Sequence, residues 1–189
     1  MTPHPTMPRP SRHVEPHGSL DTARHYIREL IYGANDGLIT TFAVVAGVAG
    51  GGLSASVILI CGVANLFADG LSMAVGNYLA IRSHESVLEA QGLPEEEASP
   101  VRHGLATFLA FVIAGTLPLL PYVTTAAAST RFAWSLTLTL TGMFAVGALR
   151  SLISTVRWWI GGTEMLTLGG AVAAIAYWSG ALVARLVGG

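Results

Sequence analysis

The sequence has no lysine, a single cysteine and few charged residues of either sign, and each shortage excludes a class of protein. Charged residues make up 11% of the chain and hydrophobic residues 52%, whereas a soluble domain carries about 25% charged residues. The lone Cys61 excludes an internal disulfide framework and a zinc site built from several cysteines. The net charge of -1 gives no indication of nucleic-acid binding. The composition therefore indicates a membrane protein, and 189 residues leave room for one domain.

Residues 1–24 are predicted to form a disordered cytoplasmic tail. They are rich in proline, serine, histidine and arginine, and they lack the apolar stretch of a signal peptide. His4, His13 and His17 are able to bind a metal ion, but a solvated tail is the preferred interpretation.

Five apolar segments follow in residues 25–189, each about 18–27 residues long. This length is enough to cross the roughly 30 Å hydrocarbon core of a bilayer. The apolar runs are continuous and not alternating, which predicts an all-α integral membrane domain of five transmembrane helices. The segments are expected over Ile27–Ala49, Ala55–Ile81, Gly104–Val123, Phe132–Leu152 and Met165–Val187.

The arginines predict the orientation of these helices. Eight of them precede the first segment or follow the second and fourth segments, and two lie on the other side. The positive-inside rule then places the amino terminus in the cytoplasm and the carboxy terminus outside. The eight are Arg9, Arg12, Arg24, Arg28, Arg82, Arg102, Arg150 and Arg157, and the two are Arg131 and Arg185.

Polar residues interrupt the first two apolar segments. Asp36 is the most informative, because a charge near mid-bilayer costs about 2.5–3.5 kcal/mol and persists where something compensates for it. Asn65, Asp69 and Met73 are spaced four apart and share one helix face. The helical rise puts Asp36 about 14 Å and Met73 about 12 Å from the cytoplasmic ends of their helices. With Glu29 at the cytoplasmic mouth, these side chains form a ladder suited to a cation that loses its hydration shell in stages.

The ligand types favour a borderline divalent metal. Carboxylate and amide oxygens suit Mg²⁺, Ca²⁺ or Mn²⁺, whereas the thioether of Met73 is soft and favours Fe²⁺, and Mn²⁺ less clearly. One chain supplies too few groups for an octahedral shell. A two-fold homodimer with the first two segments at its axis would supply two copies of Asp36 and Met73. Small residues that would let such helices approach closely are Gly33, Gly47, Gly62 and Gly76.

Each of these residues also has a simpler explanation. Asp36 and Asn65 are able to serve as interhelical hydrogen-bond partners, Met73 as packing, and Asp69 as the wall of a water-filled vestibule. The shared depth and face of Asp36, Asp69 and Met73 favour a pathway. Two other functions stay open: a non-transporting scaffold or metal sensor, and an intramembrane aspartyl protease with an Asp36–Asp69 dyad. The Gly-x-Gly-Asp pattern of such proteases is absent from the sequence.

The stretch 82–103 is predicted to be a short acidic cytoplasmic loop. If the second helix continues into it, Glu85 and Glu89 lie one turn apart and, with His84, are candidates for collecting a metal ion. A solvated loop is the preferred interpretation. Glu164, at the start of the fifth segment, is a further candidate, although its favoured role is to interact with the helix dipole. The other ionisable side chains of the loop include Glu95, Glu96, Glu97 and His103.

Two runs of sequence match motifs of a known family. Tyr32–Gly47 reads YGANDGLITTFAVVAG and Asp69–Leu79 reads DGLSMAVGNYL. They resemble the first- and second-helix signatures of the vacuolar iron transporter family. Supporting similarities occur in Phe108–Tyr122 and Glu164–Gly170. The resemblance extends from about His25 to the carboxy terminus and keeps the order of all five helices.

The resemblance implies a homodimer of five-helix subunits that exports Fe²⁺, and often Mn²⁺, from the cytosol in exchange for protons. It implies neither an enzymatic activity nor a permanently bound cofactor. The transport aspartate and methionine of the family match Asp36 and Met73, and an acid near the cytoplasmic entrance matches Glu29. We expect Asp69 and Asn65 to line the exit. We also expect the chain to lie in the inner (plasma) membrane of a bacterium.

The chain differs from plant members of that family at two places. Asn65 stands where plant members carry a glutamate, and Asp69 adds an acid one turn away. Plant members also carry a long cytoplasmic metal-binding domain, rich in glutamate and methionine, between the second and third helices. Only residues 82–103 occupy that place here.

Overall fold

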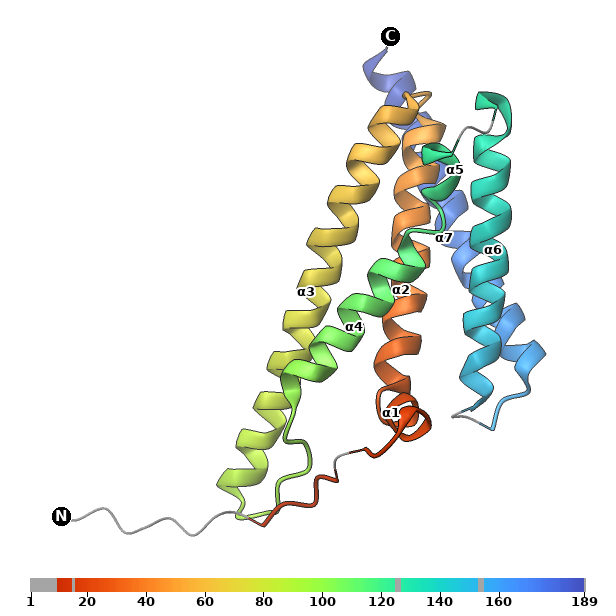
Figure 1. Cartoon of the computed structure of the whole chain (residues 1–189). Coiled ribbons are helices and arrows are strands. Elements are labelled where there is room, and N and C mark those ends of the chain that lie inside the picture. The colour runs from red at the N-terminus through yellow and green to blue at the C-terminus, as the bar shows by residue number, and fades with distance from the viewer. Residues whose placement is uncertain (1–9, 15, 125–126, 153–154, 189) are drawn as a thin grey trace, which may run out of the picture.

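The computed structural model describes residues 10–14, 16–124, 127–152 and 155–188. Over these ranges the chain is helical, and its one β-pairing is an isolated bridge between Ser11 and Glu95 (Figure 1). The predicted all-α class is therefore confirmed. The longer helices are α2 (Ile27–Gly50), α3 (Ala55–Ala90), α4 (Pro100–Gly115), α6 (Arg131–Leu149) and α7 (Trp158–Val187). The short ones are α1 (Ser19–His25), α5 (Leu120–Val123), η1 (Ala128–Thr130) and η2 (Arg150–Leu152).

Four helical stretches of the described chain are long and apolar enough to cross a membrane: α2, α3, residues 128–152 around α6, and α7. The predicted third segment is shorter because it is broken between α4 and α5, beside Pro118, which has no N–H to continue a helix. The Pro118 carbonyl accepts a hydrogen bond from Ser135 Oγ of α6 at 2.6 Å. A third crossing would therefore combine α4 with α5, and the count of five crossings stays a prediction.

Two helices differ from their predicted limits. α3 continues past Ile81 to Ala90, and its 36 residues span about 54 Å, more than the hydrocarbon core. α7 begins at Trp158 and not at Met165. At α3 the apolar pattern ends at Ile81, whereas the polar residues that follow, such as Arg82, Glu85 and Glu89, have good helix propensity and carry the helix further. The stretch 82–103 is therefore largely helical, and only residues 91–99 connect α3 to α4.

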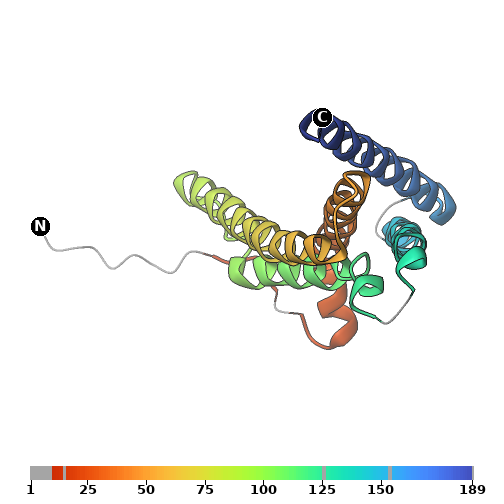
Figure 2. The same cartoon turned by 90° about the horizontal axis from the view of Figure 1, so that it is seen from above.

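Helix α2 is the centre of the bundle and contacts α3, α4, α6 and α7. Figure 2 shows α3 and α4 side by side, with α2 between α3 and α7. α2 and α4 pack so closely that a Cβ on Gly37 would overlap the backbone of Phe111. A Cβ on Gly180 of α7 would likewise overlap the backbone of Gly47. Close approach through glycine is typical of membrane helices.

The glycines expected at a dimer axis lie largely inside the single chain. A Cβ on Gly33 would meet the Thr107 carbonyl, and a Cβ on Gly62 would meet Leu119. Gly47 faces α7, whereas a Cβ on Gly76 would have nothing within 4 Å. Three of the four glycines therefore bring parts of one chain together. Gly33 packs against α4, Gly62 against Leu119 just before α5, and Gly47 against α7.

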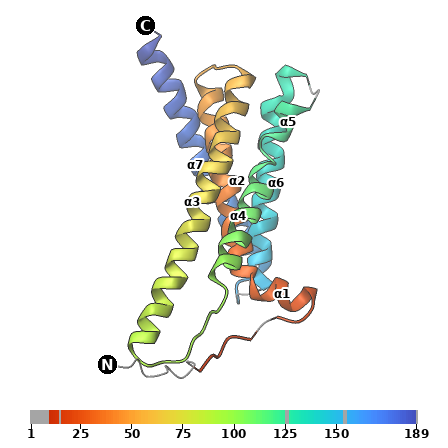
Figure 3. The same ribbon diagram turned by 60° about the vertical axis from the view of Figure 1, so that its left-hand side comes forward.

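The described part of the amino-terminal segment lies along the connection between α3 and α4. The Arg12 N–H donates to the Glu95 carbonyl at 2.7 Å, and the Glu95 N–H donates to the Pro10 carbonyl at 2.9 Å. The chain then passes to α1, beside the start of α2 (Figure 3). His4 lies outside the described residues, and the division of the chain at residues 24 and 25 stays a prediction.

Candidate functional site

The two intramembrane aspartates lie close together on neighbouring helices. Asp36 of α2 and Asp69 of α3 are both half-buried, and their carboxyl groups interact electrostatically. The glycines that follow them, Gly37 and Gly70, both face Phe111 of α4. A Cβ on Gly70 would lie 3.1 Å from the Phe111 ring. Because the same residue contacts both glycines, the two aspartates lie at one level of the bundle.

The other predicted pathway residues of α3 lie on either side of Asp69 along the helix. Met73 is half-buried and packs against the hydrophobic cluster that contains Phe42, Leu66 and Phe111. Asn65 is half-buried, and its buried Nδ2 atom has no hydrogen-bond partner among the described residues. An amide donor left without a partner inside one chain is available to an acceptor on a second chain or to a water molecule.

Glu29 lies at the start of α2 and is buried, with 3% of its surface exposed. Its Oε1 atom accepts hydrogen bonds from Nε and Nη2 of Arg28 at 3.1 and 2.8 Å. The same oxygen lies 3.2 Å from Nδ1 of His103, which belongs to the first turn of α4. The predicted entrance acid is thus an ion-pair partner of an arginine and a neighbour of a buried histidine.

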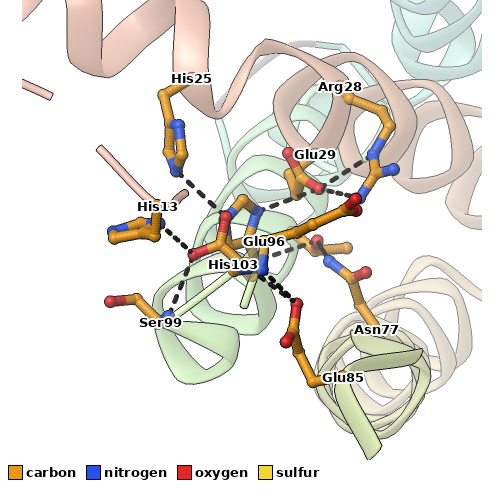
Figure 4. A network of polar contacts seen from close by, with 11 residues as sticks. His13, His25, Arg28, Glu29, Asn77, Glu85, Glu96, Ser99 and His103 are labelled. Atoms are coloured by element: carbon orange, nitrogen blue, oxygen red, sulfur yellow. Dashed lines mark hydrogen bonds and ion pairs between the residues drawn. The ribbon is translucent and has the colours of Figure 1, made fainter. Parts of the chain in front are cut away.

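Glu97 connects His103 to the amino-terminal segment. Figure 4 shows His13, His25 and His103 gathered at this point, with Glu29 nearby. Glu97 has its Oε2 atom 2.9 Å from Nε2 of His103 and 3.5 Å from Nε2 of His25. Its Oε1 lies 3.2 Å from Nδ1 of His13 and accepts the Ser99 N–H at 3.0 Å. One ligand atom from each of His25, Glu97 and His103 lies within 4.8 Å of the others. We call these three residues the histidine cluster.

A cleft of about 650 Å³ opens beside the histidine cluster, and its walls include Glu29, Asn77, Glu97 and His103. Asn77 of α3 donates from Nδ2 to Thr107 Oγ1 at 3.0 Å. Thr107 Oγ1 in turn donates to the His103 carbonyl at 3.0 Å. These two hydrogen bonds hold the first turn of α4 against α3. They thereby fix the backbone of His103, whose side chain lines the cleft.

The residues predicted to collect metal from the loop do not meet at one point. Glu85 Oε1 accepts the backbone N–H groups of Glu96 and Glu97 at 3.0 and 2.8 Å, so it holds the connection in place. Glu89 is exposed on the same helix, which does continue as far as the pairing of Glu85 and Glu89 requires. His84 is also exposed, with Nε2 3.3 Å from Glu96 Oε2.

Glu164 forms an ion pair with Arg150, whose Nη2 lies 2.8 Å from Glu164 Oε2. It lies on α7, beyond the first turn, because that helix begins earlier than predicted. The group of three in the described residues that is able to hold a metal ion includes none of His84, Glu85, Glu89 and Glu164. Their part in collecting metal stays a prediction.

The histidine cluster was not predicted from the sequence. Its members come from α1, from the connection before α4 and from α4, and no short spacing unites them. One local signal was present: His25 and Glu29 are four residues apart, which brings side chains near one another on a helical path. The contact of His103 with both carboxylates depends on tertiary packing.

The chain is similar in sequence to proteins of a known family. The model of the VIT family matches residues 27–98 and 86–181. Vacuolar iron transporter 1 of Arabidopsis thaliana is 36% identical over 105 residues, which cover 51% of this chain and 41% of that protein. The vacuolar iron transporter of Toxoplasma gondii is 38% identical over 84 residues, or 44% of this chain and 27% of that protein. Vacuolar iron transporter 2 of Oryza sativa subsp. japonica is 25% identical over 222 residues, or 87% of this chain and 89% of that protein.

The Arabidopsis and Toxoplasma alignments span less than half the length of those relatives. All three relatives are named as transporters and none as an enzyme. The family match includes both motifs, Tyr32–Gly47 and Asp69–Leu79, and it confirms the resemblance found in the sequence. Together with four apolar helices long enough to cross a bilayer, it identifies a multi-pass membrane protein. The chain belongs to the VIT family.

Proposed function

We propose that the protein exports a divalent transition metal, Fe²⁺ or Mn²⁺, from the cytosol in exchange for protons. The observation that carries the proposal is the proximity of Asp36 and Asp69 on neighbouring membrane helices. Two carboxylates in lipid repel one another unless a cation or a proton neutralises them. A divalent ion removes this repulsion when it binds, and protons remove it when the ion has left. The same pair therefore supports both metal binding and proton exchange.

The side of α2 that carries Asp36 supports a path between helices. Asp36, Thr40 and Ala43 form one stripe and are all half-buried in the single chain, whereas Thr41 and Phe42 are buried. Thr40 Oγ1 donates to the carbonyl of Asp36 in its own helix at 2.9 Å. The Asp36 carboxylate is thus left available for an ion. Met73 would add a soft ligand that favours transition metals over Mg²⁺ and Ca²⁺.

A homodimer would complete the coordination shell. Two copies related by a two-fold axis near α2 and α3 would supply paired Asp36 and Met73 side chains. The unpartnered Asn65 amide and the open face at Gly76 fit such an interface. Asp69 and Asn65 would then line the outer part of the path, and Glu29 its cytoplasmic mouth.

The proposed topology has five crossings, with α4 and α5 together forming the third. The ends of the helices support this count and the cytoplasmic amino terminus. Figure 1 shows that the start of α2, the end of α3 and the starts of α4 and α7 lie at one end of the bundle. Arg24, Arg28, Arg82, Arg102 and Arg157 are near those ends, as the positive-inside rule requires of the cytoplasmic side. In a bacterium the membrane would be the inner (plasma) membrane.

Reconstitution into liposomes tests this function. Uptake of Fe²⁺, Mn²⁺, Co²⁺, Zn²⁺ and Mg²⁺ is measured alongside a pH-sensitive dye in the lumen, with empty liposomes as the control. We expect Fe²⁺ or Mn²⁺ to enter and protons to leave, and Mg²⁺ to be excluded. The absence of flux for every ion would contradict transport and support a membrane scaffold or a metal sensor.

A further inference from the structure

The histidine cluster holds buried polar atoms whose requirements the protein does not meet. His103 has 5% of its surface exposed. Its Nδ1 and Nε2 atoms lie 3.2 and 2.9 Å from carboxylate oxygens of Glu29 and Glu97. Yet neither nitrogen has a hydrogen-bond partner of acceptable geometry within the part of the chain that the structure describes. The same holds for Nε2 of His25. Unsatisfied buried nitrogens are costly and call for an explanation.

The short distances without hydrogen-bond alignment have a simple geometric meaning. The ring nitrogens lie close to carboxylate oxygens but are not aligned with them for hydrogen bonding, and one ligand atom from each of His25, Glu97 and His103 lies within 4.8 Å of the others. A metal ion with bonds of about 2.1 Å places neighbouring ligand atoms roughly 3.0–3.4 Å apart and opposite ones about 4.2 Å apart. The distances from Glu97 Oε2 to the two ring nitrogens, 2.9 and 3.5 Å, are close to the separation of neighbouring ligand atoms.

We propose that His25, His103 and Glu97 bind a divalent transition-metal ion at the entrance of the protein. Two imidazoles and one carboxylate form a ligand set typical of Fe²⁺ with open coordination positions, and they disfavour Mg²⁺ and Ca²⁺. The site differs from the membrane path in place and in ligands, because it uses nitrogen donors and no thioether. Its use as a collecting point for cargo rests on the proposed transport function, whereas its ability to bind metal does not.

The surroundings of the site have the partners that metal ligands need. A ligating histidine normally donates its second ring N–H to a carboxylate, and Glu29 Oε1 lies 3.2 Å from the second nitrogen of His103, so that a small rotation of the ring would align the two. The Glu97 oxygen that faces away from the two ring nitrogens accepts the Ser99 N–H and lies next to His13. Glu85 fixes the backbone of Glu97 itself. The carboxylate is therefore positioned before any ion arrives.

The metal would also fasten the amino-terminal segment to the bundle. His25 belongs to α1, and the described residues before it contact the connection through the backbone pairing at Glu95 and through His13 and Glu97. An ion shared by His25 and His103 adds a link between α1 and α4. Binding is therefore expected to slow hydrogen exchange in residues 10–14 and 19–25.

Titration with Co²⁺ tests the site, because its visible absorption reports nitrogen and oxygen ligands. The full-length protein in detergent carries Asp36→Ala, so that the membrane path does not contribute. We expect one Co²⁺ per chain, binding at least tenfold weaker after His25→Ala or Glu97→Gln. His17→Ala is the matched control, because His17 is an exposed histidine of the same segment, and it should leave binding unchanged. Added Fe²⁺ under anaerobic conditions should displace Co²⁺.

Two results would overturn the site. One is no Co²⁺ absorption in the Asp36→Ala protein, which is the parent in this titration; the other is equal Co²⁺ affinity in this parent and in its His25→Ala and Glu97→Gln variants. Hydrogen exchange gives a second measurement, since Co²⁺ should protect residues 10–14 and 19–25 in the parent and not in Glu97→Gln. Flux separates the two proposals. If transport is absent while Co²⁺ still binds, the proposed function fails and the site stands. If flux depends on Asp36 while His25→Ala binds Co²⁺ normally, the site fails alone.

Discussion

Glu29 and His103 meet where the bundle begins, with His103 Nδ1 3.2 Å from Glu29 Oε1. Both side chains are buried, and they join the first turn of α2 to the first turn of α4. The contact places Glu29, the predicted entrance acid, against His103 of the histidine cluster. It lies at the start of α2, the helix that carries Asp36. An ion collected at Glu97 would therefore be one side chain away from the mouth of the proposed path.

Glu85 is expected to stabilise the connection between α3 and α4. Its carboxylate accepts the N–H groups of Glu96 and Glu97. Glu85→Ala leaves these two donors without their partner, at a cost of about 1–3 kcal/mol. Hydrogen exchange at the two amides should then accelerate on the order of five- to a hundredfold, as measured by mass spectrometry.

Glu89→Ala provides the control for this measurement, because Glu89 is exposed one turn further along the same helix. It should leave the exchange of both amides at the parent rate. Equal exchange in the Glu85→Ala and parent proteins would show that the carboxylate does not hold the connection.

Gly37 is expected to be essential for packing, because α4 leaves no room for a side chain there. A Cβ on Gly37 would overlap the Phe111 backbone, whereas a Cβ on Gly170 would have nothing within 4 Å. Gly37→Ala should destabilise the protein by about 1–3 kcal/mol, and Gly170→Ala should change its stability by less than about 0.5 kcal/mol. Thermal unfolding in detergent, followed by circular dichroism, compares the two. A Gly37→Ala protein as stable as the parent would contradict the close α2–α4 contact.

Ser135 is expected to stabilise the break between α4 and α5. Its hydroxyl satisfies the carbonyl of Pro118, which is buried. Ser135→Ala should lower the free energy of unfolding by about 0.5–1.5 kcal/mol. Thr137→Ala is a suitable comparison, because Thr137 is exposed on the same helix and donates to Ala133 of its own helix. If both variants unfold like the parent, the bond does not stabilise the break.

The helical class and the position of the central residues were predictable from the sequence, because each depends on local pattern. Continuous apolar runs predict membrane helices, and four of the predicted segments correspond to helices long enough to cross a bilayer. The four-residue spacing of Asn65, Asp69 and Met73 indicates a shared helix face. The proximity of Asp36 and Asp69 agrees with the shared depth predicted for them from the sequence.

The rest depends on contacts between distant parts of the chain. Nothing near Gly33 or Gly47 in sequence indicates that α4 and α7 pack against them. Glu97 stands in an acidic run, where a solvated face is the usual outcome, and tertiary contacts with His25 and His103 distinguish it from Glu95 and Glu96. The end of α3 was missed because charged residues end an apolar pattern without ending a helix.

Metal flux through the Asp36→Ala protein tests the central claim most directly. Parent and variant proteins are reconstituted at equal density, and their assembly is compared by size-exclusion chromatography with light scattering. We predict that Asp36→Ala abolishes Fe²⁺ and Mn²⁺ flux and the coupled proton movement while the assembly stays that of the parent, and that Met73→Ala behaves in the same way. Flux through Asp36→Ala at the parent rate would contradict the account, because the ion would then cross the membrane without the carboxylate on which the path depends.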